Sequence, residues 1–431
     1  MEKKVAGMRD LGRGEAVWAT GELVVGWGEV KEAAKEGLLA MSVAVGLKVM
    51  AEMMEEELTR KVGPKHAKLP GRRATRHASA PGSVVLGGRR IKVRRPRART
   101  SEGKEMHLDT YSSFSGDDQL TDVVMGRMLA GLATRRHKVA NEPVGGSVEA
   151  PSSSTSRSAV SRRFVACTRA TLAKLMTRDL SQLRVAALMI DGVKFADYCC
   201  VVVLGITTDG TKIPLGLFLG DTENNEVVTD LLADLVNRGL KADAGLLVVV
   251  DGSKALDRAV RDIFGPVALI QRCTLHKRRN VAAHVPRDEL RWVDRRLASA
   301  FNHPDPAVGL RLAENLARQL ECRLPDAAAS VREGLGDMFT IRSLKVSDRL
   351  ARSLGCTNAI ESLISVVRGT TRNVKRWRDA EMVERWASAG MSNAEHSFRR
   401  VQGCNDMTTL VAGLARHAAG LTFQRDTAEV A

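Results

Sequence analysis

Apolar residues in this chain recur at regular spacings, and the spacing changes along the sequence. Between residues 30 and 60 they fall three or four positions apart, which predicts one helix with a single apolar face. That face consists of Leu39, Val43, Leu47, Met50, Met54 and Leu58. We interpret this segment as a helix that packs in a core or against a second copy of the chain. Similar patterns predict helices over residues 118–138 and 172–183.

Short, almost wholly apolar runs follow, and amphipathic segments lie between them. The runs predict five strands, over residues 185–190, 199–206, 213–219, 246–250 and 268–272. Asp209 and Gly210 separate the second and third runs, and Asp-Gly between apolar runs is a strong signal for a hairpin turn. Helices are expected over residues 225–238 and 254–264. Apolar strands beside amphipathic helices indicate a sheet that is covered on both faces.

The predicted order is a strand, a hairpin of two strands, a helix, a strand, a helix and a strand. This is the order of the ribonuclease-H-like fold, in which the first and fourth strands are neighbours. The sequence therefore predicts an α/β fold class: a ribonuclease-H-like mixed five-stranded sheet with helices on both faces, an all-helical insertion, and a mainly helical basic N-terminal region.

The domain organisation follows from shifts in composition. Residues 143–161 are rich in Ser, Gly and Pro, which is typical of a linker. Residues 286–353 are helical in pattern and charged. The expected parts are an N-terminal helical region (1–60), a basic DNA-binding region (61–142), the linker (143–161), the first part of a catalytic core (162–285), a helical insertion (286–353), and the rest of the core with C-terminal helices (354–431).

The net charge of the chain indicates a class of binding partner. The chain has 431 residues, with 66 Lys and Arg against 50 Asp and Glu, a formal net charge of +16 that favours a polyanionic partner such as DNA. Seven irregularly spaced cysteines argue against a disulfide framework. We see no signal peptide and no apolar run long enough to span a membrane. A cytoplasmic, nucleoid-associated protein without a membrane partner is expected, and residues 1–28 remain without an interpretation.

The basic charge is concentrated in one segment. Residues 60–99 contain fourteen Lys or Arg and no acidic residue. Ile91 and Val93 alternate with basic residues, as in a half-buried strand. A solvated charge run is the alternative, but contact with the phosphate backbone of DNA is our prediction. The predicted contacts are Arg89, Arg90, Lys92, Arg94, Arg95, Arg97 and Arg99.

Two aspartates mark the candidate chemistry. Asp191 follows the first apolar strand and Asp251 follows the fourth, and each precedes a glycine. In α/β sheets ligands bind beyond the carboxyl ends of strands, and carboxylates there suit hard divalent cations. Either Asp-Gly alone would be interpreted as a turn. Such a site normally needs a third acid, and Glu361 lies in the first turn of a predicted helix that Thr357 or Asn358 can cap. A Glu in that position by itself is more typical of a capping or surface role.

Several short motifs then occur in order: DG at 191–192, GITTDGTK at 205–212, DG at 251–252, QRCTLHKRRN at 271–280 and TNAIE at 357–361. Together they resemble the transposases of the Mutator-like group of bacterial insertion sequences. The resemblance implies a ribonuclease-H-like catalytic domain with an Asp-Asp-Glu triad. It assigns Asp191, Asp251 and Glu361 to that triad, as ligands of Mg²⁺, with Mn²⁺ as a substitute.

Other residues of these motifs suggest supporting roles. Cys273 and His276 match a Cys-x-x-His motif of the family, but two further zinc ligands are not evident, so zinc is not expected. We interpret Cys273 as a small core residue, with His276, Lys277 and Arg278 facing DNA or the rim of the active site. The segment TTRNVKRWR at 370–378 suggests further DNA contacts through Arg372, Lys375 and Arg376. Trp377 packs or stacks, and Trp292 either packs between helices or stacks on an unpaired base.

The expected function is that of an insertion-sequence transposase that cleaves DNA strands and transfers the 3′-hydroxyl to a new site. Its partners would be the terminal repeats of the element and a target duplex, bound by a homodimer or a higher assembly. The alternatives are a ribonuclease-H-like nuclease without strand transfer and a non-catalytic DNA-binding derivative of a transposase.

Overall fold

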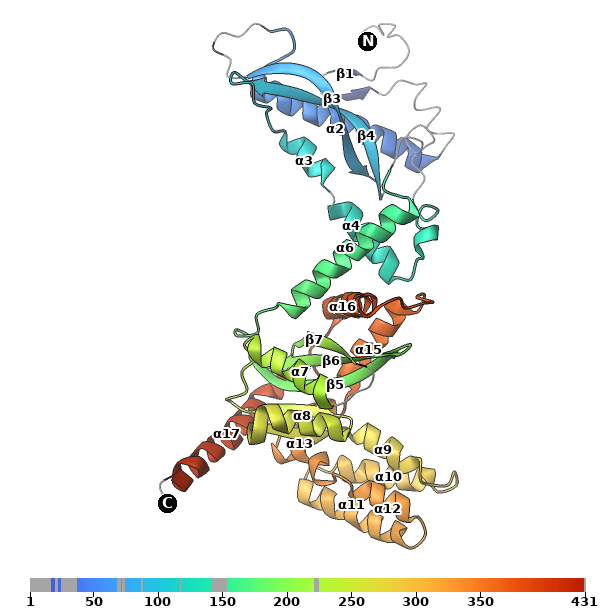
Figure 1. The fold of residues 1–431 in the computed structure, drawn as a ribbon, viewed down its shortest axis with the longest axis vertical. Helices are drawn as coiled ribbons and strands as arrows, with labels where there is room; N and C mark the ends of the chain where they lie inside the picture. Colours follow the sequence, from blue (N-terminus) through green and yellow to red (C-terminus); the bar gives the residue numbers. More distant parts are fainter. Residues whose placement is uncertain are drawn as a thin grey trace, which may run out of the picture. The chain divides into compact units, whose positions relative to one another are not determined.

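The structure, a computed structural model, describes residues 17–19, 22–24, 37–67, 71, 74–86, 88–116, 118–141, 153–220 and 225–429. The chain forms two compact units, Met1–Cys167 and Thr168–Ala431. The boundary falls within helix α6 (Arg157–Met176), and the elements of both units are labelled in Figure 1. Within the described residues, no helix is both long and apolar enough to cross a membrane.

The first unit contains a long hairpin and several helices. Strands β3 (Ala74–Leu86) and β4 (Arg89–Thr100) pair antiparallel, and helix α2 (Leu38–Val62) packs on them. The predicted strand around Ile91 and Val93 is therefore confirmed, whereas β3 was not predicted. Two further strands, β1 (Val17–Ala19) and β2 (Glu22–Val24), pair with each other. A small apolar core joins α2 to the hairpin through Leu58, Val62, Ala74, Ala98 and Leu108.

The helices of this unit differ in their bounds from the predicted ones. Residues 30–36 of the predicted first helix lie outside the described residues. The helix predicted over 118–138 is shorter: α4 (Asp118–Leu129) is separated from the 3-10 turn η1 (Thr134–Arg136) by Gly131 at φ 94°. Glycine adopts this left-handed conformation at little cost, so it ends the helix. A short helix, α3 (Asp109–Ser115), precedes α4.

Helix α6 starts earlier than predicted, at Arg157 rather than at residue 172. The hydroxyl of Ser156 accepts a hydrogen bond from the Ala159 N–H at 3.2 Å, which satisfies a free donor in the first turn. The serines that suggested a linker thus include the residue that begins the helix. Of the predicted linker, residues 143–152 lie outside the described residues.

The second unit is built on a five-stranded sheet with the order β7-β6-β5-β8-β9. Its strands are β5 (Val185–Phe195), β6 (Tyr198–Thr207), β7 (Lys212–Gly220), β8 (Leu246–Val250) and β9 (Ala268–Arg272). The hairpin strands pair antiparallel, whereas β5 with β8 and β8 with β9 pair parallel. The first and fourth strands of the sheet are therefore neighbours, as the sequence predicted.

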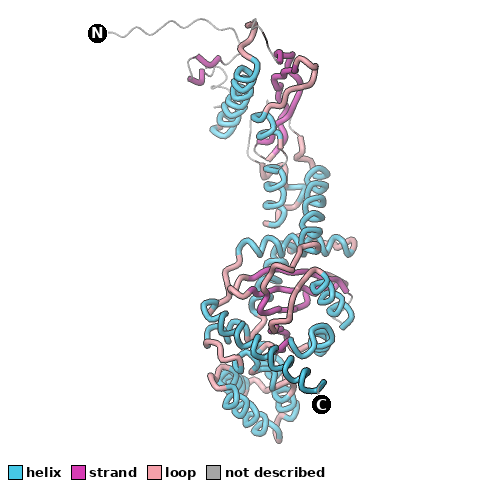
Figure 2. Tube along the Cα trace, turned by 90° about the vertical axis from the view of Figure 1, so that its left-hand side faces the viewer, coloured by secondary structure: helices cyan, strands magenta, loops and turns pink. Residues whose placement is uncertain are grey.

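Helices cover both faces of this sheet, and Figure 2 shows strands lying between helices in this unit. Helices α7 (Asn225–Asn237) and α8 (Lys254–Phe264) pack on one face with Leu188 and Ile190 of β5. On the other face, Ala187 and Met189 pack with the cores of α15 (Asn358–Thr371) and α16 (Ala380–Ser397). The 3-10 turn η4 (Cys404–Asp406) and α17 (Met407–Glu429) complete that side.

The predicted insertion is helical. Its elements are α10 (Leu290–Phe301), α11 (Pro306–Glu321), α12 (Pro325–Arg332), η3 (Gly336–Met338), α13 (Thr340–Ser343) and α14 (Asp348–Leu354), and α9 (Thr274–Ala282) precedes it. Side chains from Val281 to Phe339 form a core of their own. Ile341 and the apolar residues that follow pack instead in the core beneath the sheet, so the separate helical body ends before residue 340.

Candidate active site

The register of the two central strands brings Asp191 and Asp251 to the same place. Met189 of β5 is paired with Val249 of β8, and each aspartate lies two residues further along its strand direction. Side chains two residues apart on a strand point to the same face. Both aspartates therefore extend the face that carries Met189 and Val249, which is the face packed against α15.

One detail of the prediction is wrong. The first strand does not end at Asp191, because β5 continues to Phe195 and Asp191 is paired with Val202 of β6. Only the parallel pairing with β8 stops before the aspartate. Asp191 is thus held within a two-stranded extension of the sheet, with its carboxylate accepting the Gly192 N–H at 2.8 Å.

Asp251 lies directly after β8, as predicted, in a short turn that leads into α8. Its carboxylate accepts the Ser253 N–H at 2.8 Å. The turn needs Gly252, whose φ is 111° and where a Cβ would lie 2.5 Å from the guanidinium of Arg272. Arg272 in turn donates to the Gly252 carbonyl at 2.8 Å, which fixes the turn that carries the carboxylate.

Glu361, predicted mainly from the resemblance, lies in the first turn of α15, a helix that contacts β5. Its carboxylate accepts a hydrogen bond from the Thr357 hydroxyl at 2.9 Å. His276 Nε2 is 3.8 Å from the same oxygen, and Arg279 is 3.9 Å from it. Thr357 precedes the helix but does not cap it with its side chain, because the hydroxyl is directed to Glu361.

A buried network joins the starts of α9 and α15. Cys273 is completely buried. Its sulfur lies 3.3 Å from the Thr357 hydroxyl and accepts a hydrogen bond from the His276 N–H at 3.5 Å. The Thr357 hydroxyl oxygen is also 3.2 Å from His276 Nδ1. The Thr274 N–H donates to the Gly355 carbonyl at 3.0 Å, which adds a backbone link. The predicted core position of Cys273 is confirmed, and Thr357 is the site residue that sequence reasoning missed.

The electrostatics of the site show that these groups are close. Burial is the main cause that raises the pKa of Asp191, and with the negative charges of Asp251 and Glu361 it brings that pKa to about 6. The Gly192 N–H and His276 act in the opposite direction. Asp251 and Glu361 therefore both repel the negative charge of Asp191, and a nearby cation would relieve that repulsion.

The imidazole and the thiol beside Glu361 influence each other. The hydrogen bond with Cys273 raises the pKa of His276 despite its partial burial, and the charge of Glu361 acts in the same direction. Burial alone would raise the pKa of the Cys273 thiol, but hydrogen bonds with His276 and Thr357 outweigh it and lower that pKa. The network therefore favours a positive charge on His276 facing the carboxylates.

Lys277 was predicted to contact DNA, and this prediction is wrong. Its side chain is only 2% exposed. The ammonium donates to the carbonyls of Ser330 and Glu333 at 2.8 and 2.7 Å, and to the Glu333 carboxylate at 3.0 Å. Lys277 thus satisfies carbonyls at the end of α12 and ties the helical insertion to α9. Sequence alone could not reveal this, because those partners lie more than fifty residues away.

The carboxylates of Asp191, Asp251 and Glu361 are suitable ligands for a divalent cation. Their side chains do not, however, form a complete metal site. Among the described residues, no three His, Cys, Asp or Glu side chains converge closely enough to hold one metal ion. Carboxylate oxygens are nevertheless the donors that Mg²⁺ and Mn²⁺ prefer, and such an ion would neutralise the like charges of Asp251 and Glu361 that, after burial, raise the pKa of Asp191. The chemistry of these residues therefore fits the ion.

The predicted DNA contacts on the hairpin differ in burial and in the partners they have within the chain. Arg89 is only 1% exposed, so its predicted contact with DNA is wrong. Glu105, outside the acid-free segment, forms ion pairs with Arg95 at 2.8 Å and with Arg97 at 2.6 Å. Arg90 donates to Ser83. Exposed basic side chains remain at Lys92, Arg94 and Arg99.

The basic segment after α15 lies at the carboxyl end of β5. Trp377 packs edge to face on Phe195, the last residue of β5, with ring centroids 5.1 Å apart. Trp377 therefore has a packing role. The contact also places this segment beyond Asp191 along the strand. Arg372, Lys375 and Arg376 are exposed there.

Two further predicted residues lie in α9 and in the helical insertion, Arg278 and Trp292 respectively. Arg278 is half-buried and forms two hydrogen bonds of 2.7 Å with the Asp294 carboxylate, so its charge is compensated. Trp292 packs against the core of the insertion, and the Arg296 guanidinium lies 5.6 Å from its ring centroid. The packing role for Trp292 is therefore the one the structure supports.

Comparison with known proteins identifies the family of the chain. The profile described as "Transposase, Mutator family" matches residues 29–401. Over 298 residues the chain is 25% identical to the transposase for insertion sequence element IS905 of Lactococcus lactis subsp. lactis (strain IL1403), covering 68% of this chain and 72% of that protein. Over 204 residues it is 28% identical to the transposase for insertion sequence element IS6120 of Mycolicibacterium smegmatis, covering 46% of this chain and 62% of that protein. Since the family match spans most of its length, the chain belongs to the Mutator family of transposases.

Proposed function

We propose that this protein is an insertion-sequence transposase with a ribonuclease-H-like catalytic domain of the Asp-Asp-Glu type. It binds the ends of its element, cleaves DNA strands and joins the 3′-hydroxyl to a target duplex. One observation carries the proposal: the register of β5 and β8 aligns Asp191 with Asp251, and Glu361 interacts electrostatically with Asp191. The strand order and the family membership support it.

In this proposal Asp191, Asp251 and Glu361 hold Mg²⁺, with Mn²⁺ as a substitute. When bound, the ions activate the attacking oxygen and stabilise the leaving oxygen of the phosphodiester. The chain's own residues set the orientation of the carboxylates. The Thr357 hydroxyl holds Glu361, and the Arg272 guanidinium holds the turn that carries Asp251. No covalent bond between the enzyme and DNA is required.

The exposed basic side chains would hold the substrate. Arg372, Lys375 and Arg376 follow the helix that bears Glu361, and they would contact DNA close to the reacting phosphate. His276 faces Glu361 from α9 and would lie at the rim of the same site. Lys92, Arg94 and Arg99 would contact phosphates through the first unit. Such contacts hold DNA without reading its sequence.

The test uses purified protein, Mg²⁺ and labelled DNA carrying the element ends. Asp191→Asn, Asp251→Asn and Glu361→Gln should each abolish cleavage and joining while DNA binding remains. Asp197→Asn is the matched control, because Asp197 is an exposed residue at the tip of the same hairpin. Normal cleavage and joining by all three variants would falsify the assignment. Cleavage without joining in the unaltered protein would identify a nuclease, and binding without any Mg²⁺-dependent reaction would identify a non-catalytic derivative.

We also propose that the active form is a homodimer or a higher assembly on DNA, since two element ends must be brought together. Light scattering of the complex with end DNA tests this. A single chain bound to each DNA molecule during an active reaction would contradict it.

A further inference from the structure

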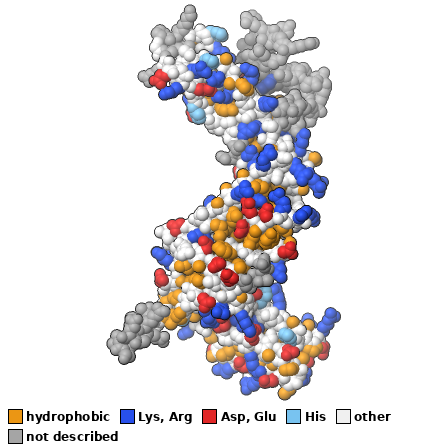
Figure 3. Space-filling view, viewed as in Figure 1, with side chains coloured by type: hydrophobic (Ala, Val, Ile, Leu, Met, Phe, Trp, Pro, Cys, Tyr) orange, Lys and Arg blue, Asp and Glu red, His pale blue; other side chains and the backbone are white. Residues whose placement is uncertain are grey.

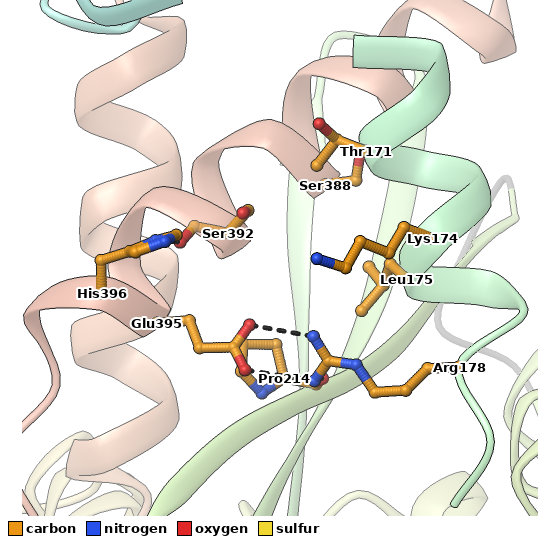
Figure 4. Close-up of a pocket in the computed structure, with 9 residues that line it drawn as sticks. All are labelled: Thr171, Lys174, Leu175, Arg178, Pro214, Ser388, Ser392, Glu395 and His396. Carbon is orange, nitrogen blue, oxygen red and sulfur yellow. Dashed lines mark hydrogen bonds and ion pairs between the residues drawn. The ribbon is translucent and has the colours of Figure 1, made fainter. Parts of the chain in front are cut away.

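A polar pocket lies between α6 and α16 in the second unit, on elements that the catalytic carboxylates do not use. It has a volume of about 290 Å³. Figure 4 shows Thr171 and Lys174 of α6, and Arg178 just after that helix, facing Ser392 and Glu395 of α16. Leu175 and Pro214 also line it. Its walls are therefore two helices that present charged groups and hydroxyls to one another.

One end of the pocket is closed by an ion pair. Arg178 donates to both oxygens of Glu395 at 3.1 and 3.2 Å, and also to the Pro214 carbonyl at 3.3 Å. The carboxylate is thus neutralised by a partner with matched geometry. Glu395 consequently does little to repel an anion in the pocket.

The remaining cation in the lining lacks a partner. Within the part of the chain that the structure describes, Lys174 forms no hydrogen bond or ion pair, and Figure 4 shows its amine directed into the space between the helices. The Ser392 hydroxyl likewise has no partner among the described residues. A lysine ammonium and a hydroxyl are donors that bind a phosphate oxygen. The pocket therefore offers unused donors and a net positive charge.

The surroundings of the pocket are basic as well. Within the second unit, α6 carries Arg169 and Lys174 and no acidic residue, and Arg169 is paired with Glu381 of α16. On the face shown in Figure 3, Lys and Arg side chains gather around this helix, with Asp and Glu side chains among them. After α16, exposed Arg399 and Arg400 continue the positive charge. This positive surface would attract a polyanion from a greater distance than it would attract a small anion.

We propose that this pocket binds a backbone phosphate of the DNA substrate, through Lys174 and Ser392, at a place separate from the three carboxylates. The inference rests on the proposed function, because DNA is the polyanion that a transposase holds. The pocket positions the duplex and takes no part in the chemistry. Lys174 is accordingly a positioning residue.

The experiment measures DNA affinity against salt for the full-length protein, by fluorescence anisotropy. Each phosphate contact contributes about 0.9 to the slope of log affinity against log salt concentration. Lys174→Gln should reduce the slope by about 0.9, so that between about 50 and 200 mM salt it loses about three- to fourfold less affinity than the unaltered protein. Ser392→Ala, which removes a neutral donor, should weaken binding with the slope unchanged.

Lys241→Gln is the matched control, since Lys241 is an exposed lysine that precedes β8, at the opposite end of that strand from Asp251. Its slope should equal that of the unaltered protein. An unchanged slope for Lys174→Gln, or an equal fall for both lysine variants, would overturn the proposal. Binding of inorganic phosphate, followed by ³¹P NMR, together with an unchanged DNA slope would assign the pocket to a small anion and also overturn it. Failure of the proposed function is separate, because it appears as absence of Mg²⁺-dependent cleavage in the unaltered protein.

Discussion

Replacing Thr357 with Val would remove one hydroxyl beside Glu361 and keep the shape of the side chain. Thr357 is completely buried, and its hydroxyl lies 2.9 Å from Glu361 and 3.3 Å from the Cys273 sulfur. A hydroxyl has a single hydrogen, and the carboxylate is the stronger acceptor, so we assign the donated bond to Glu361. His276 Nδ1 can then donate to the hydroxyl oxygen. The substitution thus removes the hydroxyl that donates to Glu361 and the acceptor of His276 Nδ1.

The expected effect can be estimated from this geometry. A hydrogen bond to a charged group contributes about 1.5–3 kcal/mol. The Glu361 side chain is 32% exposed, so water replaces part of the lost bond, and the value falls to about 1.5 kcal/mol. If that energy orients the carboxylate, the cleavage rate falls about tenfold. Loss of partners that orient metal ligands typically costs about ten- to a hundredfold in activity. We therefore expect a fall of about tenfold or more.

The assay measures the single-turnover rate at which saturating protein cleaves end DNA. DNA affinity and melting temperature are measured for the same variants. Thr357→Ser keeps the hydroxyl and should retain most of the rate. Ser362→Ala is the matched control, because the Ser362 hydroxyl donates only to the Asn358 carbonyl of the same helix. Thr357→Val should lower the rate with unchanged DNA affinity. A Thr357→Val protein that cleaves as fast as the unaltered one would refute the positioning role.

Two further predictions concern stability. Glu57 is buried, yet hydrogen bonds from Lys61 and from the backbone at the start of α3 outweigh burial and lower its pKa from 4.5 to about 2. A carboxylate with a lowered pKa stabilises the folded unit above the unfolded pKa, so this contribution should disappear as the pH falls from 4.5 towards 2, and Glu57→Gln should flatten the acid unfolding curve in that range. Gly245→Ala should destabilise the sheet unit by about 2 kcal/mol or more, because Gly245 has φ 89° and a Cβ there would lie 2.5 Å from the Leu414 carbonyl oxygen. Gly265→Ala, with φ 60° and open space around it, should cost less in the same urea titration, and equal midpoints would contradict the steric argument.

The sequence alone was sufficient for features that depend on neighbouring residues. Strands with uniform apolar runs, such as Leu246–Val250, were predicted at their observed bounds, because such runs are buried on both faces. The strand order followed from the sequence of these elements, and with it the pairing of β5 and β8. Asp251 was therefore predicted at the carboxyl end of its strand from pattern alone.

Only the tertiary structure decided features that depend on distant partners. Nothing near Glu361 in sequence indicates that α15 packs on the face of β5 that bears Asp191, or that Thr357 connects it to the start of α9. Likewise, the sequence does not distinguish Lys277 from the other basic residues of α9. Its burial follows from the hydrogen bonds that it donates to carbonyls at the end of α12. Local pattern determines which segments are strands or helices, because backbone preferences and apolar periodicity act over a few residues. The exposure of a charged side chain depends on which distant carbonyls and carboxylates the fold brings within hydrogen-bonding distance.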